Sequence, residues 1–265
     1  GRRAWQQFRQ DGRKFSPQVW QQWGTILVLG FGGTALLTAG LTLVARSLHA
    51  RGLQAWDEHW LSLLVTHLPL KFANGITWES PGNLVYLGPL IITGLVWMIG
   101  RSRPLWAATW LVAYLGQVAL VWVGWLLWNR DRPDLVANGI AAPALHSFPS
   151  GHATVVWVVY GFLAYLWWRA ARHWAERCIT VGFSLLWIGI VSSARLVLGA
   201  HWPSDVVAGW LIGMVWLGVV IVALERAEAI ARRQGSSKKR AICMNWATMQ
   251  PESGKIDEVR MRCPC

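Results

Sequence analysis

The chain has 265 residues, of which 54% are hydrophobic and only 14% are charged. This composition is typical of an integral membrane protein. The formal net charge of +12 would suit a nucleic-acid-binding protein, but the basic residues cluster in short linkers and tails between apolar segments. Such clustering is a membrane topology signal. We therefore exclude nucleic acid as a partner and expect the lipid bilayer instead.

The first part of the chain predicts a basic lead-in followed by one membrane span. Residues 1–20 are polar and carry several arginines, which is typical of a cytoplasmic segment. The span runs from about Trp23 to Ala45 without a charged residue, and it is too long for a cleavable signal peptide. Its glycines permit close helix packing in lipid.

The region between the first two spans is mixed in character. Residues 53–64 show helical periodicity with a polar face, so we expect an amphipathic helix at the outer interface of the membrane. Residues 74–83 contain Pro81-Gly82, which predicts a connection into the second span.

Five further apolar segments follow, at about residues 84–100, 105–128, 152–168, 179–198 and 206–224. Each is long enough to cross a bilayer. The predicted fold class is therefore all-α, a six-transmembrane-helix bundle over residues 21–225. Residues 226–265 are charged and differ in composition from the bundle, so we expect a disordered cytoplasmic tail there. The four cysteines show no disulfide framework.

Six spans place both termini on the same side of the membrane. That side collects the N-terminal arginines and those of two short linkers (Arg101, Arg103, Arg169, Arg172 and Arg177), so we expect it to be cytoplasmic. The loops at residues 46–83, 129–151 and 199–205 then lie on the extracytoplasmic face of the plasma (inner) membrane. Several of the 21 tryptophans stand at segment ends, which fits an interfacial aromatic belt.

Three residues whose side chains suit reactions of phosphate groups lie at the outer end of the fifth span and the start of the sixth. His201 and Asp205 are four residues apart, and Pro203 between them suits the first turn of a helix. We expect Asp205 to reach back to one ring nitrogen of His201, which would fix the tautomer and leave the other nitrogen free to attack. Arg195 has a planar fork of donors that matches a phosphate.

A second motif, Pro149-Ser150-Gly151-His152, opens the fourth span. Ser150 can cap the helix, and Gly151 lets the backbone approach a ligand closely. The first amides of the helix would then point at an anion, and His152 could donate a proton to a leaving oxygen. Taken alone, the motif also fits an ordinary capped helix start.

Together these motifs resemble the signature of the type 2 phosphatidic acid phosphatase superfamily. The matching residues are Arg132-Pro133, the stretch from Pro149 to His152, and Arg195, His201 and Asp205 at the family spacing. The resemblance extends over about residues 20–225. The family includes bacterial undecaprenyl pyrophosphate phosphatases, mammalian lipid phosphate phosphatases and soluble vanadium haloperoxidases, and the predicted spans exclude the last of these.

The resemblance implies a role for each matched residue. His201 is the nucleophile that forms a phosphohistidine, Asp205 orients it, and His152 protonates the leaving group. The phosphate oxygens are held by the remaining matched residues (Arg132, Ser150, Gly151 and Arg195). The resemblance implies that hydrolysis requires no metal and no cofactor. The alternative for the same residue types is a metal site (His146, His152, His201 and Asp205).

Two positions depart from the family pattern. The family lysine would fall at position 125, which is Trp125 here, and the serine before Arg195 is replaced by Ala194. The first change removes a phosphate-binding cation. We expect Arg130, or Lys71 from the first outer loop, to supply the missing charge.

The sequence thus predicts a membrane phosphatase that hydrolyses a lipid phosphate or pyrophosphate through a phosphohistidine. Its candidate substrates are undecaprenyl pyrophosphate, phosphatidic acid and phosphatidylglycerol phosphate. The alternative is a non-catalytic lipid-phosphate binder or transporter, which Trp125 favours. Both histidines and Asp205 argue against it, because binding alone requires neither a nucleophile nor a residue that orients one.

Overall fold

The computed structural model describes residues 2–67, 72–136 and 146–249, which form helices joined by turns and irregular loops, without strands. A π-helical turn (His49–Leu53) precedes α3, and a 3₁₀ turn (Ser80–Gly82) precedes α5. The α-helices are α1 (Arg2–Lys14), α2 (Pro17–Leu48), α3 (Gln54–His67), α4 (Phe72–Glu79), α5 (Leu84–Gly100), α6 (Pro104–Leu127), α7 (Gly151–Ala170), α8 (Trp174–Val197) and α9 (Pro203–Met249).

Six helical stretches in the described ranges are long and apolar enough to cross a membrane, and they contain α2, α5, α6, α7, α8 and α9. Their outward faces carry large apolar side chains, such as Leu126 at 80% exposure and Leu36 at 76%. Such surfaces are stable against acyl chains and not against water. The prediction of an all-α, six-span integral membrane protein is therefore confirmed.

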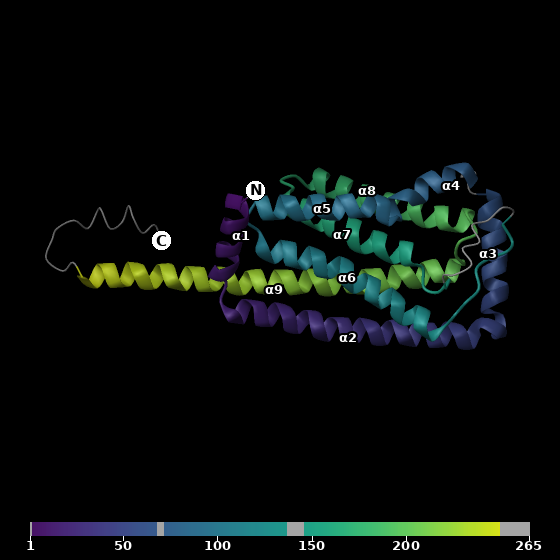
Figure 1. Ribbon diagram of the computed structural model, residues 1–265, viewed down its shortest axis with the longest axis horizontal. Coiled ribbons are helices and arrows are strands. Elements are labelled where there is room, and N and C mark those ends of the chain that lie inside the picture. The colour runs from purple at the N-terminus through teal and green to yellow at the C-terminus, as the bar shows by residue number, and fades with distance from the viewer. Residues whose placement is uncertain (1, 68–71, 137–145, 250–265) are drawn as a thin grey trace.

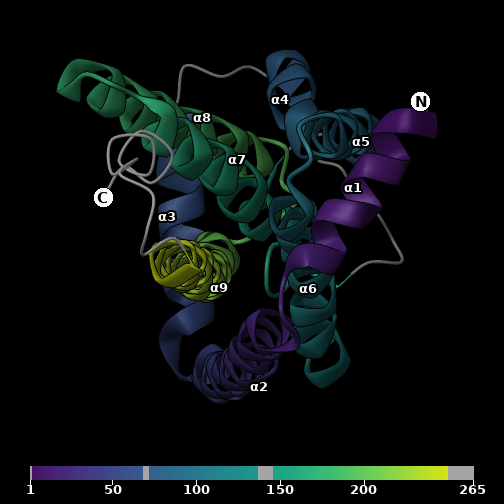
Figure 2. The same cartoon turned by 90° about the vertical axis from the view of Figure 1, so that its left-hand side faces the viewer.

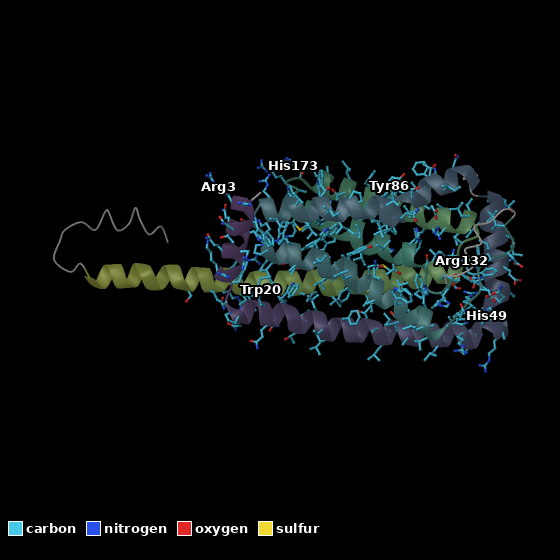
Figure 3. All side chains as sticks on the ribbon, viewed as in Figure 1. Arg3, Trp20, His49, Tyr86, Arg132 and His173 are labelled. Atoms are coloured by element: carbon cyan, nitrogen blue, oxygen red, sulfur yellow. The ribbon has the colours of Figure 1, made fainter. Side chains whose placement is uncertain are left out.

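The spanning helices run side by side along the long axis of the molecule (Figure 1). α3 lies across one end of the bundle, and α1 lies across the other end, beyond which α9 extends. Seen along the axis, α9 lies between α2 and α7 (Figure 2), and it packs against both of these helices and against α6. The side-chain view places Arg132 and His49 at the α3 end, and Arg3, Trp20 and His173 at the opposite end (Figure 3).

A helix forms where the sequence predicted one between the first two spans, and the backbone turns sharply to reach it. Gly52 has a φ of +119°, a conformation that residues with a Cβ rarely adopt. In α3, Asp57 and Leu61 are four residues apart and both are fully buried, so they share one face of the helix. Leu61 packs in a cluster with Trp202 and Val206, which fixes α3 over the end of α9.

Two segments differ from the sequence prediction. Residues 74–79 of the expected connection lie in α4, which packs against α8. The expected disordered tail after residue 225 instead continues α9 as a helix to Met249. Its first turns are rich in strong helix formers, and Glu228 accepts hydrogen bonds from Trp106 at 2.5 Å and from Arg169 at 2.7 Å. These contacts extend the bundle beyond the predicted boundary.

Small residues let α9 approach the start of α7 closely. A Cβ added at Gly209 would lie 2.7 Å from the carbonyl oxygen of Ser150 and 2.9 Å from the Cβ of Ala153. These distances are shorter than van der Waals contact allows. Glycine at this position therefore sets the distance between α9 and the loop that carries Ser150.

We predict that Gly209→Ala destabilises the protein, because the added methyl group forces α7 and α9 apart. Overpacking of this kind costs about 1–3 kcal/mol. Thermal unfolding in detergent should show a lower Tm. Gly218→Ala on the same helix is the matched control, because an added Cβ there meets nothing within 4 Å. An equal change in Tm for both variants would contradict the packing argument.

Candidate active site

The candidate site lies at the α3 end of the bundle, where three segments meet. α8 ends at Val197, and the chain turns through Gly199, whose φ is +63°. The turn is closed by a hydrogen bond of 3.0 Å from the Ala200 amide to the carbonyl oxygen of Arg195. α9 then begins at Pro203, as the sequence predicted. His201 therefore stands between the two helices.

His201 is 2% exposed, and one of its ring nitrogens is held by the backbone. Nδ1 lies 2.8 Å from the carbonyl oxygen of Ser147. Because a carbonyl oxygen only accepts, Nδ1 carries the proton and Nε2 keeps a lone pair. We expected Asp205 to make this bond, but its Oδ2 is 3.6 Å from Nδ1. The tautomer is thus set by Ser147, with the carboxylate of Asp205 close by.

Burial lowers the pKa of His201 to about 4. The ordinary value for histidine is about 6.5, so the ring is neutral at neutral pH. Arg132 is half-buried on the segment after α6 and interacts electrostatically with both His201 and Asp205. The site therefore combines an uncharged imidazole with a nearby cation.

Asp205 is fully buried, and both of its carboxylate oxygens accept hydrogen bonds. Oδ2 accepts from the Ser147 hydroxyl at 2.5 Å and from the Trp202 amide at 2.8 Å. Oδ1 accepts from Nη1 of Arg130 at 2.7 Å. Four hydrogen-bonding groups near one carboxylate, including the neighbouring imidazole, leave Asp205 little freedom to move.

Arg130 occupies a different position from the one that the sequence suggested. Its guanidinium is buried and donates to Asp57 at 2.6 Å, to Gln54 at 3.0 Å and to Ser204 at 2.8 Å, in addition to Asp205. Asp57 also accepts from the backbone amide of Ser204 at 2.8 Å. With both Nη atoms bound to protein oxygens, Arg130 links α3 to α9. The Nε of Arg130, like that of Arg195, has no hydrogen-bond partner among the described residues. A phosphate-binding role for Arg130 therefore stays a prediction, and Lys71 lies outside the described residues.

The Pro-Ser-Gly-His motif starts α7 as predicted. Ser150 is the N-cap, and its Oγ accepts from the Ala153 amide at 3.4 Å. Its own amide donates to the carbonyl oxygen of Asp205 at 3.0 Å, which ties the loop to α9. Nε2 of His152 lies 2.8 Å from Oδ1 of Asn83, at the N-terminus of α5. The four residues thus belong to one hydrogen-bonded unit with α5 and α9.

Arg195 is buried at the end of α8 and forms an ion pair with Glu79, the last residue of α4. Within the described part of the chain, the Nε of Arg195 has no hydrogen-bond partner. A buried donor of this kind is costly unless a ligand satisfies it. Arg195 is therefore placed to bind an anion.

Four other residues in or near these motifs make no contact with His201 or Asp205 that the structure shows. Asp131 and Asp134 are exposed, and His146 contacts Asn129. Ala194, which replaces the family serine, is fully buried in α8. No group of three His, Cys, Asp or Glu side chains in the described ranges is arranged to hold a metal ion.

Besides Ser147, sequence reasoning missed Asp57, Glu79 and Asn83, which contact residues of the site. Asp57 could have been found most easily from the sequence, because it is an acidic residue one turn before Leu61 on the inward face of a predicted helix. Glu79 and Asn83 fall in the segment predicted as a connection. Their partners, Arg195 and His152, are far away in the chain, so no local pattern indicated either contact.

Comparison with known proteins identifies related chains. Residues 106–228 match the model of the PAP2 superfamily. The chain is 27% identical to an undecaprenyl-diphosphatase of Sulfolobus acidocaldarius over 53% of its own length, but this match spans 65% of that protein, just under two thirds. It is also 27% identical to phosphatidylglycerophosphatase B of Bacillus subtilis, over 65% of this chain and 85% of the relative.

The fold is also that of a solved structure. The crystal structure of a transmembrane PAP2 type phosphatidylglycerolphosphate phosphatase from Bacillus subtilis aligns with a TM-score of 0.60 and 21% identity. The alignment covers 74% of this chain and 96% of the other. This similarity shows the shared helical architecture.

We predict that Asp57→Asn lowers both stability and turnover. The change leaves the buried Arg130 with one carboxylate fewer, which costs about 3 kcal/mol. It also loosens Asp205 and His201, so kcat should fall at least about tenfold with little change in KM. Thermal unfolding and steady-state kinetics on a lipid phosphate would measure these effects. His59→Gln, at an exposed position on the same helix and outside the Arg130 network, is the control and should leave both quantities unchanged.

A second prediction concerns the protonation of His201. Because burial disfavours the charged imidazole, His201 should stay neutral as the pH falls and take a proton only near pH 4. ¹⁵N NMR of histidine-labelled protein in detergent would follow this titration, with His201→Gln to assign the signal. In denatured protein the same residue should titrate near about pH 6.5. A His201 midpoint near that value in the folded protein would contradict the burial argument.

Proposed function

Because residues 106–228 match the model of the PAP2 superfamily, we propose that this protein is a membrane phosphatase that hydrolyses a lipid phosphate through a phosphohistidine at His201. The observation that carries the proposal is the state of this side chain. Its pKa of about 4 keeps it neutral, and its Nδ1 proton is held by the carbonyl oxygen of Ser147. A neutral imidazole with a free Nε2 lone pair is a competent nucleophile.

The first step transfers the phosphoryl group to the enzyme. Nε2 of His201 attacks phosphorus, the bond to the leaving oxygen breaks, and His152 gives a proton to that oxygen. The imidazole becomes positively charged as the new bond forms. Asp205, 3.6 Å from Nδ1, stabilises this charge.

The second step returns the enzyme to its starting state. Water attacks the phosphohistidine, His152 accepts a proton from it, and the bond between Nε2 and phosphorus breaks. Inorganic phosphate leaves, and His201 is neutral again. The same histidine thus acts first as an acid and then as a base.

The transferred phosphoryl group needs donors for its non-bridging oxygens. Arg132, the unpartnered Nε of Arg195 and the Gly151 amide at the N-terminus of α7 supply them. The Ser150 hydroxyl keeps one proton that it can donate. In this proposal the substrate phosphate competes with Glu79 for Arg195, so binding rearranges that ion pair.

The site is proposed to face the extracytoplasmic side of the plasma membrane. The loops at the α1 end carry the arginines of the short linkers, and the positive-inside rule assigns such loops to the cytoplasm. Both termini would then be cytoplasmic. A lipid could keep its tail in the bilayer while its phosphate reaches His201. Undecaprenyl pyrophosphate, phosphatidic acid and phosphatidylglycerol phosphate are the candidate substrates, and the names of the relatives point to this class.

The second candidate function is binding or transport of a lipid phosphate without catalysis. Trp125, at the position of the family lysine, favours it because the site lacks one cation. A binder does not require His201 as a nucleophile, so this residue distinguishes the two functions.

We predict that His201→Gln abolishes phosphate release, by at least about 10³-fold, because it removes the nucleophile. Purified protein in detergent with a chelator would be assayed on phosphatidic acid and undecaprenyl pyrophosphate. Rapid quenching with a ³²P-labelled substrate should trap an acid-labile, base-stable label on the wild type and none on the variant. His59→Gln, at an exposed position on α3, is the matched control and should retain full activity.

The binding function makes the opposite prediction. It would be supported if the wild type released no phosphate while His201→Gln kept its affinity for lipid phosphate vesicles. Phosphate release that persists in His201→Gln would instead show that another group is the nucleophile.

A further inference from the structure

A cavity of about 160 Å³ opens beside His152 and Gly151. It runs between α5, α6 and α7. Trp125 lines it from the C-terminal end of α6, and Tyr114 and Gln117 line it from earlier turns of the same helix. The rest of its wall is apolar and includes Leu84, Leu87, Val118, Val121 and Val155. The residues that the structure describes around this cavity include neither lysine nor arginine.

Trp125 shapes the cavity where it meets the phosphate site. Its ring would lie 3.7 Å from a Cβ added at Gly151, so it stands against the backbone that starts α7. Its indole N–H donates to the carbonyl oxygen of Pro149 at 3.1 Å. An indole has only this one donor. Trp125 therefore presents a face without charge or free donor where the family has a lysine.

The position of His152 identifies this cavity as the space for the leaving group. This step rests on the proposed function, in which His152 protonates the oxygen that departs. A phosphate monoester releases a neutral alcohol. A diphosphate releases a lipid monophosphate, which stays negatively charged and would lie in a largely apolar cavity whose described lining includes no cation. Burial of an unpaired charge is strongly unfavourable.

The charges around His201 point the same way. Among the residues that the structure describes, the site contains three arginines and three buried carboxylates, whose formal charges balance (Arg130, Arg132, Arg195, Asp57, Glu79 and Asp205). A diphosphate brings more negative charge than a monoester, and these described side chains carry no surplus of positive charge to match it.

We propose that the substrate is a lipid phosphate monoester, with its neutral leaving alcohol in the cavity beside His152, and that Trp125 is the residue that disfavours diphosphates. The reaction breaks the bond between phosphorus and the ester oxygen, and a proton from His152 completes the alcohol. The lipid tail follows the apolar wall of the cavity.

The experiment compares two substrates that differ only in their phosphate. Phosphatidic acid and diacylglycerol pyrophosphate with the same acyl chains would be assayed with the full-length wild type in detergent. We expect kcat/KM to be at least about tenfold higher for the monoester, because the diphosphate leaves one charge unpaired. Trp125→Lys should shift this ratio at least about tenfold towards the diphosphate.

Two further variants separate charge from shape. Trp125→Phe keeps an aromatic wall, and Trp125→Gln removes the ring without adding charge, so both should keep the preference for the monoester. A shift towards the diphosphate in Trp125→Gln as large as that in Trp125→Lys would overturn the electrostatic explanation. If Trp125→Lys does not fold, the wild-type ratio decides the question by itself.

The outcomes also separate this inference from the proposed function. A wild type that hydrolyses the diphosphate as well as the monoester, with both activities lost in His201→Gln, would overturn the monoester inference and support the phosphatase. Hydrolysis of neither substrate would overturn the proposed function and the inference together.

Discussion

The candidate site depends on the buried contact of Arg130 with Asp57 and Asp205. It joins three segments that are distant in the sequence: α3, the stretch after α6, and the first turn of α9. Buried ion pairs add little net stability, because the loss of hydration offsets the attraction. Removing one partner, however, strongly destabilises the protein, because the other charge is left buried and unpaired. The contact therefore acts mainly by fixing geometry. Asp57 also accepts a hydrogen bond from the amide of Ser204. In this way α3 holds the first turn of α9 in place and, with it, the position of Asp205 beside His201.

The features that the sequence predicted correctly are those encoded locally. Uninterrupted apolar runs predicted the six spans, since length and hydrophobicity alone decide whether a helix suits a bilayer. Ser150 caps α7 and Pro203 starts α9 because both effects operate within one turn of helix. The known family spacing added the expectation that His152 and His201 share one site. The structure places both at the same end of the bundle, where Arg132 interacts electrostatically with His201.

The features that the sequence did not predict depend on the paths of the loops. Nδ1 of His201 donates a hydrogen bond to the carbonyl oxygen of Ser147. Because every residue has a backbone carbonyl, the sequence does not indicate which one will be the acceptor. Arg130 was expected to bind phosphate in place of the family lysine, which is Trp125 here. Its direction was decided instead by Asp57, 73 residues earlier in the chain. The ion pair between Arg195 and Glu79 has the same origin, because α4 lies where a connection was expected.

The balance of charges explains how a site without the family lysine could still turn over. A cation that binds the substrate and the transition state equally strengthens binding without raising kcat. It also holds inorganic phosphate after the phosphohistidine is hydrolysed. In the proposed mechanism Arg195 binds the phosphate and also pairs with Glu79. The ion pair between Arg195 and Glu79 can therefore form again as the product leaves. On this argument Trp125 limits the range of substrates more than the rate on a monoester, because the leaving alcohol is neutral and needs no cation beside it.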